Sequence, residues 1–169
     1  LGAITYGGTI PPDKVLSADV TSVSNNIDVT FNVTADKDDR KAYGYMVLAA
    51  KEKSLLSSVD PDNVPAGVVS RTVEVGNANV GDEMTARVPG LEFNTSYFVG
   101  IMGYDYVGNF SAMSPVWQVT TKANNPPVIS TDYEGDFRVK SFESLVVRFN
   151  VSDPDGHMLT VNFENGSTA

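Results

Sequence analysis

The sequence predicts an all-β protein built as an antiparallel β-sandwich, and three observations lead to this prediction. Short segments with β-strand signals follow one another along most of the chain, and in the clearest of them apolar and polar residues alternate, as in a strand that buries one face. Clusters of Gly, Pro, Asn and Asp separate these segments at roughly the 8–12-residue spacing of sandwich strands. No long segment repeats its apolar residues at the helical spacing of three or four. The chain therefore favours strands packed in two sheets.

Seven strands are expected between residues 13 and 122. The clearest is 27–34, where apolar and polar residues alternate without a break. Residues 35–41 are predicted to form a charged loop. A long connection at 52–67 contains two prolines, and its residues 54–58 can form one helical turn. The expected strands are 15–22, 27–34, 43–50, 68–75, 83–88, 96–106 and 116–122.

Two segments flank this predicted sandwich domain. Residues 1–12 form a lead-in that ends in two prolines. At 123–127 the run Asn-Asn-Pro-Pro indicates a stiff linker, because successive prolines cannot continue a strand ladder. The remaining segment, 128–169, is too short for a complete sandwich, so we expect an incomplete second domain with an uncovered apolar face. Its candidate strands are 139–142, 144–151 and 158–163.

The composition excludes several kinds of function. The chain has no cysteine, so it can form neither a disulfide nor a thiolate site. Its formal net charge of −9 argues against a nucleic-acid partner, which requires clustered Lys and Arg. The longest apolar run, 45–50, is far too short to span a bilayer, so no membrane insertion is expected.

Residues 88–97 are expected to turn the chain from one sheet into the other. Leu91 is followed by a short polar corner, and Tyr97 then opens an apolar run. The ring of such a tyrosine can enter the core while its hydroxyl bonds to the backbone near 90–94. Leu91 and Tyr97 are therefore predicted to be the structural residues of this corner.

This corner resembles the tyrosine corner of fibronectin type III domains. Residues 104–111 also resemble the D-x-x-G-N-x-S turn between the last two strands of bacterial members of that family. The resemblance covers about residues 13–121 and implies a sandwich that spaces and contacts other domains rather than performing chemistry.

Two further resemblances concern the flanking segments. Residues 151–160 resemble the D-P-D-G-x-x-L-T turn of cadherin-like and immunoglobulin-like repeats in bacterial surface proteins. Residues 1–8 resemble the last helix of a subtilisin-like catalytic domain. These resemblances imply that the chain belongs to a longer, exported bacterial protein, and that the parent is a subtilisin-like serine endopeptidase.

We expect no catalytic residue in the chain itself. His157 is the single imidazole, it lies in a predicted turn, and no G-x-S-x-G nucleophile elbow is present. The carboxylates that could form a glycosidase pair lie in predicted loops, where acidic residues commonly form a solvated surface.

No cofactor is expected, with a structural calcium ion as the alternative. Three loops, 36–39, 60–63 and 153–155, place carboxylates two residues apart, and Ca²⁺ takes oxygen ligands. Asp side chains in such positions also cap turns without any ion. Asp153 and Asp155 are the preferred calcium ligands among them.

One apolar patch is expected on the outer face of the sandwich. The tyrosine corner assigns Tyr97 and alternate residues after it to the core, and the resemblance to fibronectin type III domains implies the same for Tyr45, Val47 and Ala49. The residues left on the outer face of these two strands, 43–50 and 96–106, are largely apolar, although such faces are usually polar. The cover is either the chain's own 54–68 connection or a docked partner, with Phe98 and Tyr104 as anchors. The candidate interface is Met46, Leu48, Phe98, Met102 and Tyr104.

The function expected from these observations is that of a non-catalytic accessory region, located extracellularly or on a bacterial cell surface. Its partners would be neighbouring domains of the same polypeptide and a protein or glycan surface. The alternative is a glycan-binding or adhesive module, which would need exposed aromatic side chains. Trp117 is expected to face the core, because it alternates with Val119.

Overall fold

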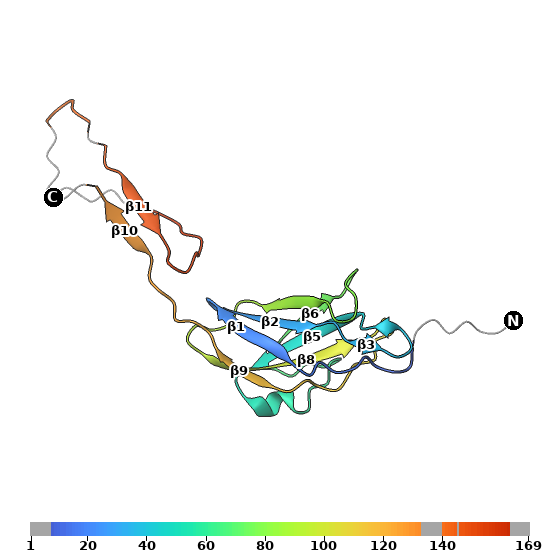
Figure 1. The fold of residues 1–169 in the computed structure, drawn as a ribbon. Helices are drawn as coiled ribbons and strands as arrows, with labels where there is room; N and C mark the ends of the chain where they lie inside the picture. Colours follow the sequence, from blue (N-terminus) through green and yellow to red (C-terminus); the bar gives the residue numbers. More distant parts are fainter. Residues whose placement is uncertain (1–7, 133–139, 145, 163–169) are drawn as a thin grey trace. The chain divides into compact units, whose positions relative to one another are not determined.

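The computed structural model describes residues 8–132, 140–144 and 146–162. The chain divides into two compact units, Leu1–Ala123 and Asn124–Ala169 (Figure 1). The segment 1–7, on which most of the subtilisin resemblance rests, lies outside the described residues. Within the described ranges, no helix has the length and apolar character needed to cross a membrane.

The body of the first unit is formed by two large antiparallel sheets (Figure 1). One sheet has the strand order β1-β2-β7 and the other has the order β6-β5-β8-β9. This arrangement confirms the all-β, fibronectin type III-like antiparallel sandwich. The strands are β1 (Ala18–Val23), β2 (Asn26–Asn32), β5 (Gly44–Ala50), β6 (Val68–Glu74), β7 (Glu83–Val88), β8 (Ser96–Tyr104) and β9 (Trp117–Thr120).

All seven expected strands are present, and they differ from the predictions only at their ends. The strand β8 stops at Tyr104 rather than at 106, because Asp105 begins a hydrogen-bonded turn. The expected charged loop contains a two-residue ladder between β3 (Ala35–Asp36) and β4 (Arg40–Lys41). The predicted helical turn is a 3-10 helix, η1 (Lys53–Leu56).

The main core lies between the two sheets, where each strand contributes alternate residues. Phe31 and Tyr45 meet edge to face with ring centroids 4.7 Å apart. The Tyr45 hydroxyl accepts a hydrogen bond from the Thr34 N–H at 2.6 Å, so its polar end is satisfied inside the core. Trp117 and Val119 pack against this core, as their alternation predicts.

A second core lies on the outer face of β5 and β8, and it decides between the two kinds of cover that the sequence left open. Met46, Leu48 and Met102 face outward as predicted, but they are only 8%, 0% and 9% exposed. The chain itself covers them, so they are not a free interaction surface. The covering residues come from η1 and the connection after it and from the segment before β9: Leu55, Leu56, Val59, Val64, Phe110, Met113 and Val116.

The second unit contains one two-stranded antiparallel ribbon, formed by β10 (Val128–Thr131) and β11 (Phe149–Ser152). Strand β10 was not predicted, because its four residues do not alternate between apolar and polar. The prediction of a strand at 139–142 is wrong for its described part, since residues 141 and 142 form a turn. Residues 158–162 have no regular structure, although a strand was expected at 158–163.

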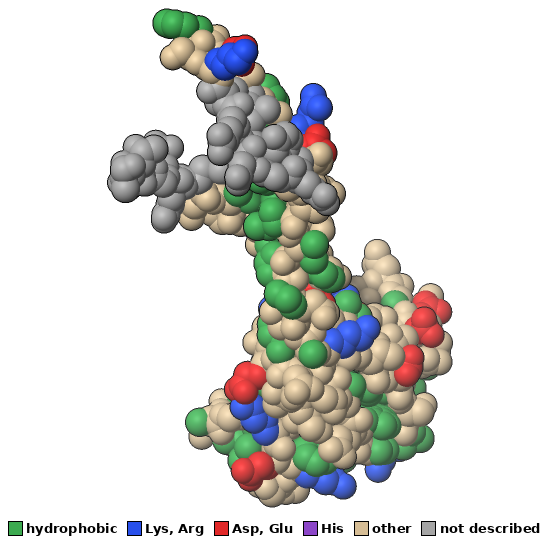
Figure 2. All heavy atoms as spheres, turned by 90° about the vertical axis from the view of Figure 1, so that its left-hand side faces the viewer, with side chains coloured by type: hydrophobic (Ala, Val, Ile, Leu, Met, Phe, Trp, Pro, Cys, Tyr) green, Lys and Arg blue, Asp and Glu red, His purple; other side chains and the backbone are tan. Residues whose placement is uncertain are grey.

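The ribbon has no covered apolar face within the described residues. No hydrophobic side chain of the second unit is buried there, and Figure 2 shows hydrophobic side chains on its surface. A two-stranded ribbon cannot bury such a face by itself. The exposed side chains are Val128, Ile129, Phe142, Val146, Phe149, Met158 and Val161.

Candidate functional site

The tyrosine corner has the predicted geometry. Tyr97 is 4% exposed, and its hydroxyl accepts a hydrogen bond from the Glu92 N–H at 3.1 Å. The Leu91 side chain is also buried, while the Leu91 N–H donates to the Asn25 carbonyl at 2.9 Å. Thr121 donates from its hydroxyl to the Glu92 carbonyl at 2.6 Å and so closes the corner against the last strand. These residues therefore serve the fold, as expected.

The turn at 105–109 is built around one buried carboxylate. Asp105 is 1% exposed, and its Oδ1 accepts the N–H groups of Val107 at 3.0 Å and Asn109 at 2.8 Å. The Asn109 amide donates to Asp105 Oδ2 at 2.6 Å. Gly108 has a φ of 93°, a conformation that favours glycine. Every polar residue of the D-x-x-G-N pattern is thus used to fix the turn.

Two serines take the place of a neighbouring strand along the end of β8. Ser111 Oγ accepts the Gly103 N–H at 2.9 Å, and Ser114 Oγ accepts the Ile101 N–H at 2.9 Å. Both hydroxyls are buried and donate onward to main-chain carbonyls. Because β9 pairs only with residues 96–99, these bonds satisfy the part of β8 that would otherwise be an open edge.

Four aromatic side chains gather at the end of the sandwich where β8 stops. Tyr43 meets Tyr106 edge to face at 5.4 Å and Tyr104 at 6.0 Å, and Tyr104 lies 5.5 Å from Phe110. Gly44 makes this approach feasible, because a Cβ there would collide with the Tyr104 ring. We call Tyr43, Tyr104, Tyr106 and Phe110 the aromatic cluster. It is partly open to solvent, since Tyr43 is 39% and Tyr106 74% exposed.

The carboxylate of Glu74 gives the aromatic cluster a negative charge. That charge raises the pKa of Tyr43, with smaller contributions from desolvation and from a hydrogen bond to Glu74. Burial raises the pKa of Tyr104, and Glu74 and Tyr43 add to this rise. Both phenols are therefore neutral donors at neutral pH. The cluster can offer aromatic faces, hydroxyl donors and one carboxylate acceptor to a ligand.

The predicted five-residue interface is divided by the structure. Met46, Leu48 and Met102 belong to the buried second core, and Phe98 is half-buried against it. Tyr104 belongs to the aromatic cluster instead. The sequence analysis did not identify Tyr43 and Tyr106 as partners of Tyr104. Gly44, which follows Tyr43 and lies opposite Tyr104, was the residue that could have indicated them, because it leaves room for the Tyr104 ring.

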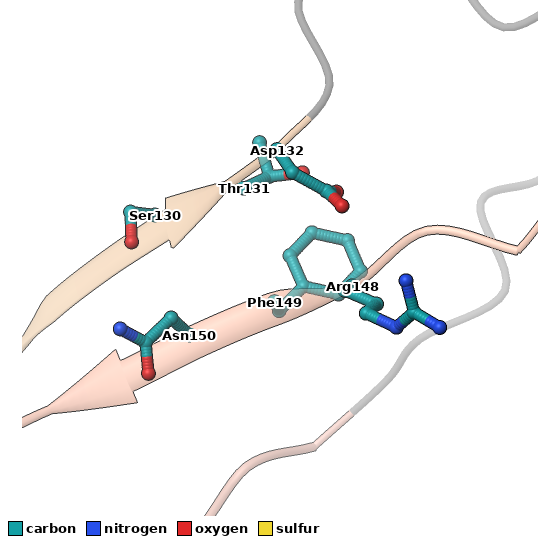
Figure 3. Close-up of a pocket in the computed structure, with 6 residues that line it drawn as sticks. All are labelled: Ser130, Thr131, Asp132, Arg148, Phe149 and Asn150. Atoms are coloured by element: carbon teal, nitrogen blue, oxygen red, sulfur yellow. The ribbon is translucent and has the colours of Figure 1, made fainter.

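A hollow of about 440 Å³ lies on the ribbon of the second unit (Figure 3). Its walls include the cross-strand pair Ser130 and Asn150, together with Phe149 and Arg148. Every residue that lines it is exposed. It is thus an open surface depression rather than an enclosed site that could exclude water.

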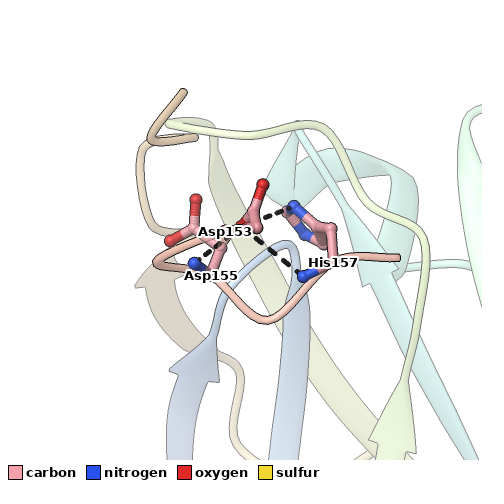
Figure 4. A group of neighbouring side chains, drawn as sticks. All are labelled: Asp153, Asp155 and His157. Atoms are coloured by element: carbon pink, nitrogen blue, oxygen red, sulfur yellow. Dashed lines mark hydrogen bonds and ion pairs between the residues drawn. The ribbon is translucent and has the colours of Figure 1, made fainter. Parts of the chain in front are cut away.

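The predicted calcium ligands Asp153 and Asp155 lie together with His157 (Figure 4). Asp153 Oδ1 accepts the Asp155 N–H at 2.8 Å and lies 3.5 Å from both the N–H and Nδ1 of His157. Asp155 Oδ2 accepts the Asn125 N–H at 2.6 Å. These carboxylates already cap their own turn and the nearby linker, which is the alternative to an ion that the sequence left open.

A second group of carboxylates, Asp36, Asp38 and Asp39, lies in the loop between β3 and β4. Burial raises the pKa of Asp36, and the neighbouring Asp38 adds to this rise. Partial desolvation opposes the shift at Asp38, but hydrogen bonds from the Thr9 and Ile10 N–H groups lower its pKa. The two acids therefore differ: the surroundings of Asp36 disfavour its charged form, whereas those of Asp38 favour it.

The basic side chains form no strip on the face that Figure 2 draws. There, Lys and Arg side chains are scattered singly, with acidic and polar side chains between them. Two of the cations are held in ion pairs, Arg87 with Asp28 and Lys51 with Glu92. That face offers no continuous positive surface to a phosphate backbone.

Comparison with known proteins finds distant structural similarity. No protein family profile and no curated protein matches the chain. A structure of chicken CNTN1 FN1-FN3 domains is 17% identical over 67% of this chain, with a TM-score of 0.45, and the match spans 33% of that structure's own chain. A structure described as a myokine is 15% identical over 66% of this chain and 98% of its own, with a TM-score of 0.39.

A third solved structure, FN3tt, is 16% identical over 66% of this chain and 96% of its own, with a TM-score of 0.37. The likenesses are distant, and the chain's own strand order gives its fold. That order makes the first unit a fibronectin type III-like β-sandwich module.

Proposed function

We propose that this chain is a non-catalytic spacer and interaction region of a larger exported bacterial protein. The observation that carries the proposal is the use of the buried polar groups in the first unit. Asp105, Ser111, Ser114 and Thr121 all bind main-chain groups. Such bonds stiffen the body of the domain and leave contact with partners to its surface side chains.

The parent in this proposal is a subtilisin-like serine peptidase located outside the cell. Its first support is the resemblance of residues 1–8 to the last helix of such a catalytic domain. Its second is the resemblance of the turn at 104–111 to that of bacterial fibronectin type III domains. In this role the sandwich would hold the catalytic domain at a distance from a surface, and the second unit would begin the next β domain.

The gene that encodes the chain tests the parent's identity. We expect a subtilisin-like catalytic domain directly before Leu1, and a completed second β domain after Ala169. Further sandwich repeats on both sides, without any catalytic domain, would identify an adhesive stalk and contradict the peptidase proposal.

A second candidate function, glycan binding, is favoured by the aromatic cluster. The Tyr106 ring stands 74% exposed next to the Tyr43 ring, and the Glu74 carboxylate lies close enough to shift the pKa of Tyr43. Aromatic faces can stack on the apolar faces of sugar rings, while a carboxylate accepts hydrogen bonds from their hydroxyls. The Tyr43 and Tyr106 rings meet edge to face, so they do not form one flat platform.

Affinity electrophoresis of the whole chain through gels that contain soluble polysaccharides tests glycan binding. We expect retardation in at least one gel, and we expect Tyr106→Ala to abolish it. Leu16→Ala is the control, because Leu16 is similarly exposed, at 71%, but belongs to no aromatic group. Unretarded migration of the wild type in every gel, or equal retardation of Tyr106→Ala, would contradict this function.

A further inference from the structure

The short hairpin between β3 and β4 forces three carboxylates together. Asp36 pairs with Arg40 across the ladder, and the three residues between them form the turn. Arg40 has a φ of 73°, which closes the hairpin tightly. As a result, one carboxylate oxygen from each of Asp36, Asp38 and Asp39 lies within 4.8 Å of the others.

One of these carboxylates is buried and only half satisfied. Asp36 is 3% exposed, and its Oδ1 accepts the N–H groups of Asp38 at 3.1 Å and Asp39 at 3.2 Å. Its other oxygen, Oδ2, is buried and has no hydrogen-bond partner. A buried carboxylate oxygen without a partner is destabilising, because it loses its hydrogen bonds to water and forms none inside the protein.

The chain that enters the first unit supplies donors to the other two acids. Asp38 Oδ2 accepts the N–H groups of Thr9 at 2.8 Å and Ile10 at 3.1 Å, and Asp39 Oδ2 accepts the Gly8 N–H at 3.2 Å. Gly8 must be a glycine for this approach, since a Cβ there would collide with the Asp38 carboxylate. These donors hold Asp38 and Asp39 in place, but none of them reaches Asp36 Oδ2.

No basic side chain among the described residues completes the group. The ion pairs in the described ranges join Lys51 with Glu92, Arg87 with Asp28, and His157 with Asp153. Three carboxylates at this separation repel one another, and a cation between them would remove both the repulsion and the unsatisfied oxygen.

We propose that Asp36, Asp38 and Asp39 bind a calcium ion. The ligand atoms are all carboxylate oxygens, which suit a hard cation and offer no nitrogen or sulfur for zinc. Calcium accepts six to eight oxygens in flexible geometry, whereas magnesium requires a near-ideal octahedron, and an irregular loop meets the first condition more easily. Water and main-chain carbonyls would complete the coordination.

The ion would have a mechanical role that suits a spacer. It would fix the turn that Gly8, Thr9 and Ile10 hold, and so attach the incoming chain to the sandwich. The Gly8 carbonyl also accepts the Asn109 amide at 3.1 Å, which connects this segment to the turn beside the aromatic cluster. Calcium would thus stiffen the end of the first unit at which the preceding segment enters.

Calorimetric titration of the whole chain with CaCl₂ at pH 7.5, after removal of divalent ions with a chelator, tests the proposal. We expect saturable binding to the wild type and a melting temperature that rises with the calcium concentration. Asp36→Asn should weaken binding by about tenfold or more, because calcium affinity follows the charge of the ligands. Magnesium at equal concentration should raise the melting temperature less.

Asp62→Asn is the matched control, since Asp62 is an exposed loop acid that also lies two residues from another aspartate. It should bind calcium as the wild type does. Should Asp36→Asn fail to fold by circular dichroism, the exposed Asp38→Asn carries the same expectation.

Three results would overturn the proposal. The first is a wild type that neither binds calcium nor melts at a higher temperature in its presence. The second is unchanged calcium affinity in both Asp36→Asn and Asp38→Asn. The third is a response that Asp153→Asn removes, which would assign the ion to the second unit. A wild type that is stabilised by lower pH but does not respond to calcium would also overturn the proposal. It would mean that Asp36 is neutralised by a proton instead of an ion.

Discussion

The same turn occurs once in each unit, in very different surroundings. Asp105 and Asp153 each direct Oδ1 at the N–H groups two and four residues further along the chain. A glycine three residues after each aspartate has a positive φ, 93° at Gly108 and 76° at Gly156. The first turn lies at the end of a sandwich with two cores, whereas the second follows a ribbon without a buried hydrophobic side chain among its described residues.

The comparison shows that turn chemistry and domain stability come from different sources. A carboxylate, a glycine and three or four backbone groups are enough to specify the turn, and they are neighbours in sequence. Stability depends on the apolar area removed from water, which the first unit buries on both faces of β5. Three pairs of variants and one single variant follow, from the largest expected effect to the smallest.

Removal of a second-core side chain should have the largest effect. Leu48→Ala is expected to lower the free energy of unfolding of the first unit by about 3 kcal/mol, through lost burial and a residual cavity. Urea unfolding followed by fluorescence measures it, because Trp117 is the only tryptophan and reports the first unit. Ile129 lies at a 67% exposed position of the ribbon. Ile129→Ala should therefore change the opening free energy of the second unit, measured by amide exchange, by less than about 0.5 kcal/mol.

Equal costs for Leu48→Ala and Ile129→Ala would break the comparison, because they would mean that the ribbon has a core as costly to disrupt as that of the sandwich. A cost for Leu48→Ala below about 1 kcal/mol would instead mean that the cover over β5 is loose.

The next largest effect is expected from the two turn aspartates, Asp105 and Asp153, whose removal should lower stability by different amounts. Asp105→Ala leaves the N–H groups of Val107 and Asn109 and the Asn109 amide without their acceptor, so we expect a loss of about 2 kcal/mol. Asp153→Ala should cost less than about 1 kcal/mol, because Asp153 Oδ1 makes one short bond, to the Asp155 N–H at 2.8 Å, and its contact with the His157 N–H is long, at 3.5 Å. Amide exchange at Val107 and Asp155 compares the two turns directly. A larger cost for Asp153→Ala would contradict this difference in hydrogen bonding.

Removal of the corner hydroxyl should have a smaller effect. Tyr97→Phe is expected to cost about 1 kcal/mol, since the Glu92 N–H loses its acceptor while the ring stays in place. Tyr106→Phe is the control, because its ring is mostly exposed and water can serve its hydroxyl. An unchanged unfolding midpoint for Tyr97→Phe would remove the energetic argument for the tyrosine corner.

The smallest effect is expected at the surface ion pair between Asp28 and Arg87. Hydrogen bonds from Arg87 lower the pKa of Asp28 from its ordinary value of 3.8, although desolvation opposes the shift. A lowered carboxyl pKa stabilises the fold above the unfolded-state value, and the contribution is lost as pH falls through the folded-state value. With Arg87 half-exposed, we expect Asp28→Asn to cost no more than about 0.5 kcal/mol at pH 7.

The difference between Asp28→Asn and the wild type should vanish as pH falls below 3.8, and it should shrink in high salt because the pair is screened. Urea midpoints at several pH values and salt concentrations measure this. A difference that grows toward low pH would contradict the sign.

The sequence by itself determined the strands of the first unit, the faces they present and the tyrosine corner. Alternation in 27–34 is a local property and assigns its faces directly. In β5, where every residue is apolar or glycine, the resemblance to fibronectin type III domains placed Tyr45 inward and Leu48 outward, as the structure has them. The corner and the turn at 105–109 need only residues that are close in sequence, such as Glu92 and Tyr97. For the same reason, the predicted strand 139–142, which lacks clear alternation, is wrong over its described residues, and β10 was missed.

Only the tertiary structure decided what covers the outer face and which acids come together. Leu56 and Met113 lie on connections whose paths no local pattern fixes, and they seal the patch that the sequence left open to a partner. Gly8 contacts Asp39 across 31 positions of the chain, and Tyr43 contacts Tyr106 between different strand ends. Periodicity and turn chemistry act between neighbours, whereas such contacts depend on the entire course of the backbone, so the aromatic cluster and the group around Asp36 emerge only in three dimensions.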